Sequence, residues 1–153
     1  MTAQIYEQLI LNGKRTSMAS CPTIPSDHPM IRAVNEDDHH DEESHRACYS
    51  TACWRRYLGS WEIKDKRLYL CELTGRWRMT SKKPIFADWF SGLLCVPEGE
   101  LLTYVHLGFA SVFEQELLID IEDGIVLDSW IKVNRGKVHD VDALAEKYLR
   151  GEE

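Results

Sequence analysis

The chain has 153 residues and a formal net charge of −7, and 44% of its residues are hydrophobic. This length is typical of one domain, and this composition of a globular protein. No apolar run approaches the ~20 residues that a membrane-spanning helix needs, and the negative charge argues against nucleic acid as a partner. We therefore expect a single domain over residues 1–153 that does not contact a membrane.

The N-terminus and the cysteines favour a cytoplasmic location. The start, MTAQIYEQLILNGKR, lacks the basic residues of a secretory signal, and Glu7 and Gln8 interrupt its short apolar stretch. An odd number of cysteines without an export signal argues against a disulfide framework, because a reducing compartment keeps thiols free. The five cysteines are Cys21, Cys48, Cys53, Cys71 and Cys95.

The first predicted element is a β-hairpin. Gln4 to Leu11 is rich in strand-forming residues, and Lys14 to Met18 forms the returning strand. The Asn12-Gly13 pair between them is a favoured two-residue turn, because both positions tolerate a positive φ.

Residues 20–46 are predicted to form a long acidic surface loop. Three prolines interrupt its first half, and six acids lie between positions 36 and 43 without a lysine or arginine. Such a block repels itself and stays solvated. Within this loop a short helix is predicted near Pro29 to Val34.

The middle of the chain is predicted to be sheet. Trp61 to Ile63 and Arg67 to Leu73 form a second hairpin around Asp65-Lys66. A long apolar stretch follows from Ile85 to Val96, in which Gly92 marks a bulge or a bend. A turn at Pro97 to Glu100 then leads into a strand from Leu101 to Leu107.

The clearest predicted strand runs from Phe113 to Ile121. Its odd-numbered residues are apolar or neutral and its even-numbered residues are mostly acidic, with Leu118 as the exception. This alternation is typical of a strand with one face in the core and one in water. Asp123-Gly124 then turns the chain, and Ile125 to Val133 pairs back.

A short helix is predicted at the C-terminus, with Asp140 as its N-cap. Its apolar residues recur at helical spacing, Glu146 and Arg150 can pair on the outer face, and Gly151 ends it. The apolar face comprises Val141, Leu144, Ala145 and Tyr148. The predicted fold class is therefore α+β, mainly antiparallel β, with about seven to eight strands in successive hairpins and a short C-terminal helix.

One cluster has the residue types of a zinc site. His40, His45, Cys48 and Cys53 follow the spacing H-x4-H-x2-C-x4-C, beside His39. Zinc binds imidazole nitrogen and thiolate sulfur tetrahedrally, so these four could form a closed structural site. The alternative is that they are unremarkable thiols and exposed histidines. We expect no other cofactor.

The region from Trp54 to Lys83 is basic and aromatic. It holds nine lysines and arginines against three acids, a formal charge of +6, which leaves −13 for the rest of the chain out of a total of −7. Basic residues interleaved with aromatics can bind single-stranded nucleic acid by charge and stacking. The alternative is that the aromatics belong to the core and that the bases offset the acidic half.

A third set surrounds His106, with Tyr104, Ser111 and Glu114 close in sequence. A histidine beside a carboxylate can act as an acid–base pair, which would suit a small enzyme or a ligand-binding barrel. No G-x-S-x-G or H-E-x-x-H motif accompanies it. We therefore expect no enzyme activity and assign no catalytic residue.

The acidic residues give the favoured functional hypothesis. An acidic face can cover the basic cleft of a toxin or a nucleic-acid-processing enzyme, and its charge steers association. The sequence thus favours a non-enzymatic protein-binding inhibitor of the immunity, antitoxin or phage-inhibitor type, from a bacterium or a phage. An open sheet edge could also support a homodimer. The partner-binding residues would be Glu36, Asp37, Asp38, Asp41, Glu42, Glu43, Glu114, Glu116, Asp120 and Glu122.

Overall fold

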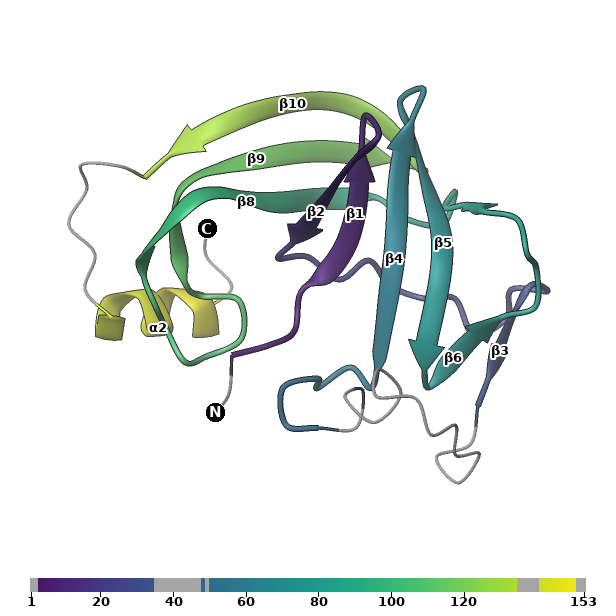
Figure 1. The fold of residues 1–153 in the computed structure, drawn as a ribbon, viewed down its shortest axis with the longest axis horizontal. Coiled ribbons are helices and arrows are strands. Elements are labelled where there is room, and N and C mark those ends of the chain that lie inside the picture. The colour runs from purple at the N-terminus through teal and green to yellow at the C-terminus, as the bar shows by residue number, and fades with distance from the viewer. Residues whose placement is uncertain (1–2, 35–47, 49, 135–140, 151–153) are drawn as a thin grey trace.

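The computed structural model describes residues 3–34, 48, 50–134 and 141–150 (Figure 1). Most of this part of the chain is β-strand, followed by one helix near the C-terminus. The elements are β1 (Glu7–Leu11), β2 (Lys14–Met18), β3 (Ile31–Ala33), β4 (Tyr57–Lys64), β5 (Arg67–Gly75), β6 (Trp77–Met79), β7 (Ile85–Phe86), β8 (Gly92–Thr103), β9 (Val112–Glu122), β10 (Ile125–Val133) and α2 (Val141–Leu149).

The strands form one large curved sheet in the order β2-β1-β4-β5-β10-β9-β8, with β7 added beside β5. β3 and β6 pair separately as a small two-stranded sheet. Beyond β2 the chain reaches β8, where the Ala19 N–H donates to the Cys95 carbonyl at 2.8 Å and the Cys95 N–H donates to Ser20 Oγ at 2.7 Å. The sheet is therefore rolled into a partly closed barrel.

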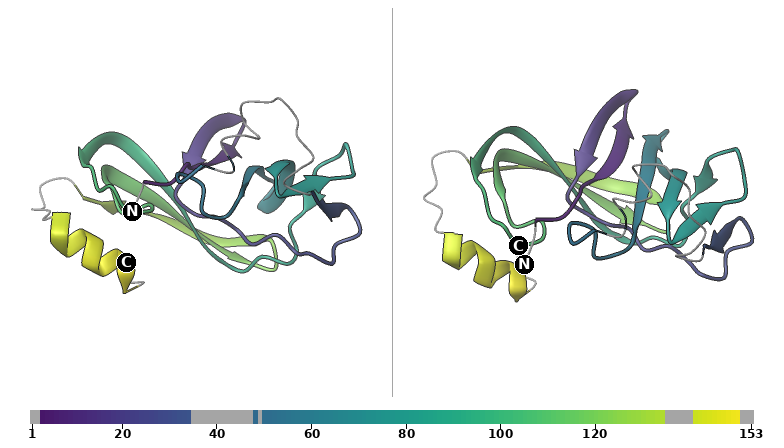
Figure 2. Two further views of the ribbon diagram at one scale, coloured as in Figure 1. Left: turned by 90° about the horizontal axis from the view of Figure 1, so that it is seen from below. Right: turned by 60° about the horizontal axis from the view of Figure 1, so that its bottom comes forward.

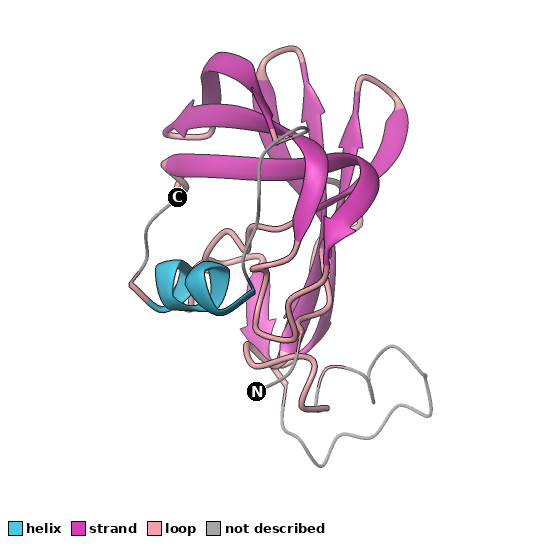
Figure 3. Cartoon of the chain, turned by 90° about the vertical axis from the view of Figure 1, so that its left-hand side faces the viewer, coloured by secondary structure: helices cyan, strands magenta, loops and turns pink. Residues whose placement is uncertain are grey.

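The barrel is open between β5 and β10. These two strands share a single residue pair, Ile125 with Arg67, whereas β10 pairs with β9 along almost its whole length. Figure 1 shows β8, β9 and β10 as an arch that runs from the upper ends of β4 and β5 toward the left of the molecule. α2 lies below one end of this arch, as the turned views in Figures 2 and 3 also show.

The predicted hairpins are confirmed. Asn12 and Gly13 have φ values of 53° and 79°, and Asp123 and Gly124 have 50° and 79°. Positive φ at both central residues gives the turn twist that matches two paired strands. The C-terminal helix is also present, and Glu146 pairs with Arg150 at 3.9 Å. Its predicted cap and stop, Asp140 and Gly151, lie outside the described residues.

Three expectations are wrong. Ile31 to Ala33 is not helical, because it pairs with β6, and this tertiary pairing outweighs local preference. Residues 97–100 do not form a turn between strands; they lie within β8, which continues to Thr103 through an irregular register beyond Glu98. The strands do not all follow one another in successive hairpins either, since β1 and β4 run parallel, although the sheet is mainly antiparallel as expected. The long connection after β2 brings β4 alongside β1 in that direction.

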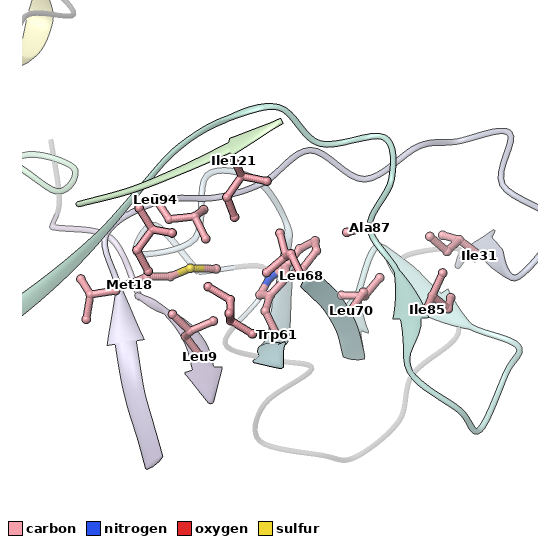
Figure 4. Packing of buried hydrophobic residues seen from close by; sticks show 13 residues of the cluster. Leu9, Met18, Ile31, Trp61, Leu68, Leu70, Ile85, Ala87, Leu94 and Ile121 are labelled. Carbon is pink, nitrogen blue, oxygen red and sulfur yellow. The ribbon is translucent and has the colours of Figure 1, made fainter. Parts of the chain in front are cut away.

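The core lies where the rolled sheet encloses its own inner face (Figure 4). Trp61 is fully buried at its centre, with Leu9, Leu68, Leu94 and Ile121 around it. Burial of each such side chain contributes roughly 1.5–3 kcal/mol. These residues come from the arch and from β1, β4 and β5, which we call the lower strands. The core therefore joins the arch to the lower strands.

Candidate functional site

A cavity of about 570 Å³ lies between α2 and the outer face of the arch. It is lined by strand residues of β8, β9 and β10, by residues 109–111 of the loop before β9, and by the helix. Eight of the lining residues provide the apolar and polar side chains of the candidate site: Cys95, Glu116, Leu118, Trp130, Lys132, Leu144, Lys147 and Tyr148.

The strand register explains why these side chains meet. Cys95 lies opposite Leu118, and Leu118 lies opposite Trp130. Two residues further along the strands, Glu116 lies opposite Lys132. Alternate residues of a strand share a face, so the apolar row and the charged row both point toward α2.

Contacts around Gly108 hold the helix at the mouth of the cavity. A Cβ at Gly108 would overlap the hydroxyl and ring of Tyr148, so only glycine lets the tyrosine pack there. The N-terminal residues support this loop, since the Gln4 N–H donates to the Gly108 carbonyl at 2.9 Å. Gly108 also has a φ of 55°, which glycine adopts without cost.

Tyr6 lies close to the cavity residues. Burial raises the pKa of the Tyr6 hydroxyl, and the nearby Cys95 and Glu116 raise it further. The Tyr6 ring also packs against Phe109, with ring centroids 5.3 Å apart. Tyr6 thus remains protonated and can donate a hydrogen bond at neutral pH.

A cluster of polar groups is buried between β1 and β4. The Glu7 carboxylate, which is fully buried, forms an ion pair with Arg55 at 2.9 Å and accepts the Gly59 N–H at 2.7 Å and the Trp61 Nε1–H at 3.4 Å. Burial raises the pKa of Glu7, and Arg55 and the hydrogen bonds partly offset that rise. Because the Glu7 carboxylate is not accessible to solvent, its ion pair with Arg55 indicates a role in stabilising the fold.

The zinc prediction is only partly accessible to the structure. His40 and His45 lie outside the described residues. Cys48 and Cys53 are both fully buried, and they hydrogen-bond to each other. Among the described residues, no three His, Cys, Asp or Glu side chains are grouped closely enough to hold a metal ion. Zinc binding by these four residues stays a prediction.

The thiol pair has an uneven proton affinity. The hydrogen bond from Cys48 lowers the pKa of Cys53 to about 7, against the opposing effect of burial. The same bond, together with burial, raises the pKa of Cys48. Each thiol also has a backbone carbonyl as an alternative acceptor, since Cys48 Sγ lies 3.4 Å from the Thr74 oxygen and Cys53 Sγ 3.3 Å from the Tyr57 oxygen.

The basic and aromatic region is divided between core and surface. Trp61 and Tyr57 are buried and so cannot stack on bases, and Arg55 is committed to Glu7. Two surface arginines instead lie over rings of the same region, Arg67 over Phe86 and Arg76 over Trp77, at 5.6 and 5.2 Å from the ring centroids. The region therefore does not present one continuous stacking platform.

His106 is not among the residues that line the cavity beneath α2. It is exposed and hydrogen-bonds through Nδ1 to the Tyr104 hydroxyl at 2.7 Å. Ser111 Oγ bonds to the backbone of Val105, and the Glu114 carboxylate accepts the Glu100 N–H at 3.1 Å. Tyr104 and His106 are therefore partners of each other, whereas Ser111 and Glu114 bond elsewhere, and Glu114 does not form the predicted acid–base pair with His106.

The acidic residues of β9 have four different surroundings. Glu114 packs at the Gly99 bend, and Glu116 lines the cavity. Asp120 lies directly opposite Asp128, and Glu122 is exposed at the end of the strand. The acids of positions 36–43 lie outside the described residues.

Sequence reasoning missed most of the cavity. Of the eight lining residues named above, only Glu116 was among the predicted site residues, and it was expected on an open surface. The available signal was Leu118, the apolar exception on the acidic face of its strand. An apolar residue at such a position indicates that something covers that face. The covering element is α2.

Comparison of the chain with protein-family models, with curated proteins and with solved structures finds no match in any of the three. In the part of the chain that the structure describes, no helix has the length and apolar character needed to cross a membrane.

Proposed function

We propose that this protein binds a small amphipathic ligand, with an apolar body and an anionic group, in the cavity beneath α2. The observation that carries the proposal is the cavity itself, whose volume of about 570 Å³ lies within the range of ligand sites. Such sites are mostly apolar with a few placed polar groups. No chemical step is included, in keeping with the expectation that the protein is not an enzyme.

The apolar body of the ligand would lie along one row of the sheet. Cys95, Leu118 and Trp130 form this row, and Leu144 faces it from the helix. Trp130 is 43% exposed and so has surface left to bury. Covering such surface contributes roughly 25 cal/mol per Å² of apolar area removed from water.

The charges at the cavity favour an anion. Lys132 and Lys147 carry two positive charges against the one negative charge of Glu116. The Tyr148 hydroxyl adds a hydrogen-bond donor from the helix. A carboxylate that binds both lysines would be held by charge-assisted hydrogen bonds, which are stronger than neutral ones.

Titration calorimetry with dodecanoate tests the proposal. We expect one equivalent to bind, and we expect Leu118→Trp to abolish binding because the larger side chain fills the cavity. Lys132→Gln and Lys147→Gln should each weaken binding about tenfold, or ~1.4 kcal/mol. Lys64→Gln, an exposed lysine on β4 away from the cavity, is the matched control and should bind as the wild type does. Binding that Leu118→Trp leaves intact would contradict the proposal.

A second candidate function is the protein-binding inhibitor predicted from the acidic residues. The observation that favours it is the pair Asp120 and Asp128, which lie opposite each other on neighbouring strands. Like charges in this position destabilise a sheet, so a basic partner would relieve them. Glu122, at the same end of β9, adds a third exposed acid.

Affinity capture from lysate tests this second candidate. A stoichiometric partner retained by the wild type and lost by Asp120→Asn with Asp128→Asn would support it. Glu146→Gln, an exposed acid on α2, is the control and should retain the partner. The inhibitor hypothesis fails if the wild type and the double variant retain the same proteins.

A further inference from the structure

β10 has one unpaired edge. One side of the strand pairs with β9 from Ile125 to Val133. On the other side, the described residues offer only Arg67 opposite Ile125 and a bond from the Val126 N–H to the Lys66 carbonyl. Residues 127–133 therefore form a free edge, which lies on the outside of the arch in Figure 1.

The free edge is apolar and exposed. Leu127 is 57% exposed, Ile131 48% and Val133 54%. Long apolar edge strands invite pairing with another strand, and soluble proteins usually protect them with charges, prolines or bulges. This edge has a register shift between Val126 and Asp128, but its remaining residues continue as a regular strand.

The backbone direction of the edge follows from the last bond of the ladder. The Asn134 N–H donates to the Glu114 carbonyl on β9 at 2.9 Å. Backbone groups alternate along a strand, so the N–H and C=O of Ser129 and Ile131 point away from β9, toward the free edge. The Asp128 carboxylate accepts the Ser129 N–H at 2.8 Å, which covers this donor while no strand is present.

We propose that this edge pairs with the same edge of a second copy of the chain, antiparallel, with the two Trp130 residues opposite each other. In this register Ser129 and the partner's Ile131 would exchange both backbone hydrogen bonds. Asp128 would lie opposite the partner's Lys132, and the partner's Asp128 opposite Lys132. The arches of two copies would then form one continuous sheet.

Charge complementarity selects this register. Asp128 and Lys132 lie at equal distances from Trp130 along the strand. Moving the two-fold axis by one residue in either direction places both charges opposite uncharged residues. Within one chain Asp128 faces Asp120, so the partner's Lys132 would also offset a repulsion that the monomer contains.

The dimer goes beyond the proposed ligand binding and does not depend on it. Its pairing surface is the backbone edge of β10, whereas the cavity is formed by side chains that face α2. Trp130 and Lys132 belong to both surfaces, so a ligand effect on dimer formation would be a further result and not a requirement.

Sedimentation equilibrium over a concentration series tests the inference. We expect the wild type to form a dimer, and we expect Asp128→Lys and Lys132→Asp each to raise its dissociation constant at least ~tenfold, because each creates like charges across the axis. The double variant Asp128→Lys with Lys132→Asp should dimerise again. An equimolar mixture of the two single variants should form a heterodimer, because their charges are complementary.

Two controls keep the result interpretable. Circular dichroism establishes that each variant is folded, and Lys82→Asp changes the net charge at an exposed site between β6 and β7 that pairs with no part of β10. A wild type that sediments as a monomer at every concentration would overturn the inference. So would single variants that fail to dimerise and are not rescued either by the double variant or by mixing.

Discussion

The lower strands and the arch differ in which side chains they bury and which they leave exposed to solvent. Around β1 and β4 the protein buries a charged pair, Glu7 with Arg55, and gives the carboxylate three hydrogen-bond or ion-pair partners. In the arch, β10 leaves Leu127, Ile131 and Val133 about half exposed. Polar groups are thus enclosed in one region and apolar groups are open to solvent in the other.

This difference indicates that one region stabilises the fold and the other binds partners. The enclosed region supplies stability, because its groups already have their partners. The arch has a cavity and an unpaired strand edge, and both leave apolar surface or backbone hydrogen-bonding groups available to bind a partner. Regions that bind partners are often those with the fewest internal contacts.

Removing the buried carboxylate should cost the most. Glu7→Ala leaves the N–H groups of Gly59 and Trp61 without the carboxylate acceptor, and it leaves the Arg55 guanidinium with the Ile5 carbonyl but without its counter-charge. Breaking a buried pair in this way typically costs ~3–5 kcal/mol of the free energy of unfolding. Urea denaturation measures the change. Glu116→Ala in the arch is the matched control and should cost less than ~1 kcal/mol. Equal losses for the two variants would contradict the division between the regions.

Gly108→Ala should release α2 from the arch. The new Cβ would overlap the Tyr148 ring in addition to straining a left-handed backbone. Gly13→Ala is the control, because Gly13 also has a positive φ but no heavy atom near its missing Cβ. Backbone strain alone should cost ~1–2 kcal/mol in each variant, and the overlap at Gly108 a further ~1–3 kcal/mol.

Amide hydrogen exchange distinguishes the two glycine variants. The backbone amides of α2 should exchange faster in Gly108→Ala than in the wild type, and their exchange rates should be unchanged in Gly13→Ala. Adding Tyr148→Ala to Gly108→Ala should remove the overlap, so that the remaining loss of stability reflects strain and the missing tyrosine. Unchanged exchange in α2 would mean that Tyr148 does not anchor the helix.

The buried thiols should give a smaller, pH-dependent effect. The pKa of Cys53 is lowered from 9.0 to about 7 in the folded chain. Between these values the unfolded chain binds more protons, so the free energy of unfolding should rise with pH. Cys53→Ser should abolish this rise, whereas Cys71→Ser on β5 should leave it. Denaturation at a series of pH values provides the measurement, and a flat wild-type profile between pH 7 and 9 would contradict the assignment.

The elements that sequence predicted well are those determined by local chemistry. Asn12-Gly13 and Asp123-Gly124 need positive φ at two successive residues, so the turn and the strands on both sides follow. The alternation in β9 likewise predicts a strand, because it reflects burial on one face.

What sequence could not predict depends on contacts between distant segments. The parallel pairing of β1 with β4 is determined by the path of the chain after β2, which no local pattern records. The same is true of β10, since its apolar residues resemble a buried strand until the sheet order shows that β5 meets it at one end only. The cavity requires both α2 and the register that aligns Leu118 with Trp130.

Backbone chemical shifts during a titration with dodecanoate show whether the cavity beneath α2 binds a ligand. We expect saturable shifts at Cys95, Leu118 and Trp130 and along α2, and unchanged shifts in the hairpin at Asn12 and Gly13. Shifts confined to other surfaces, or no saturable shift at all, would contradict the proposal that the cavity beneath α2 is a ligand site.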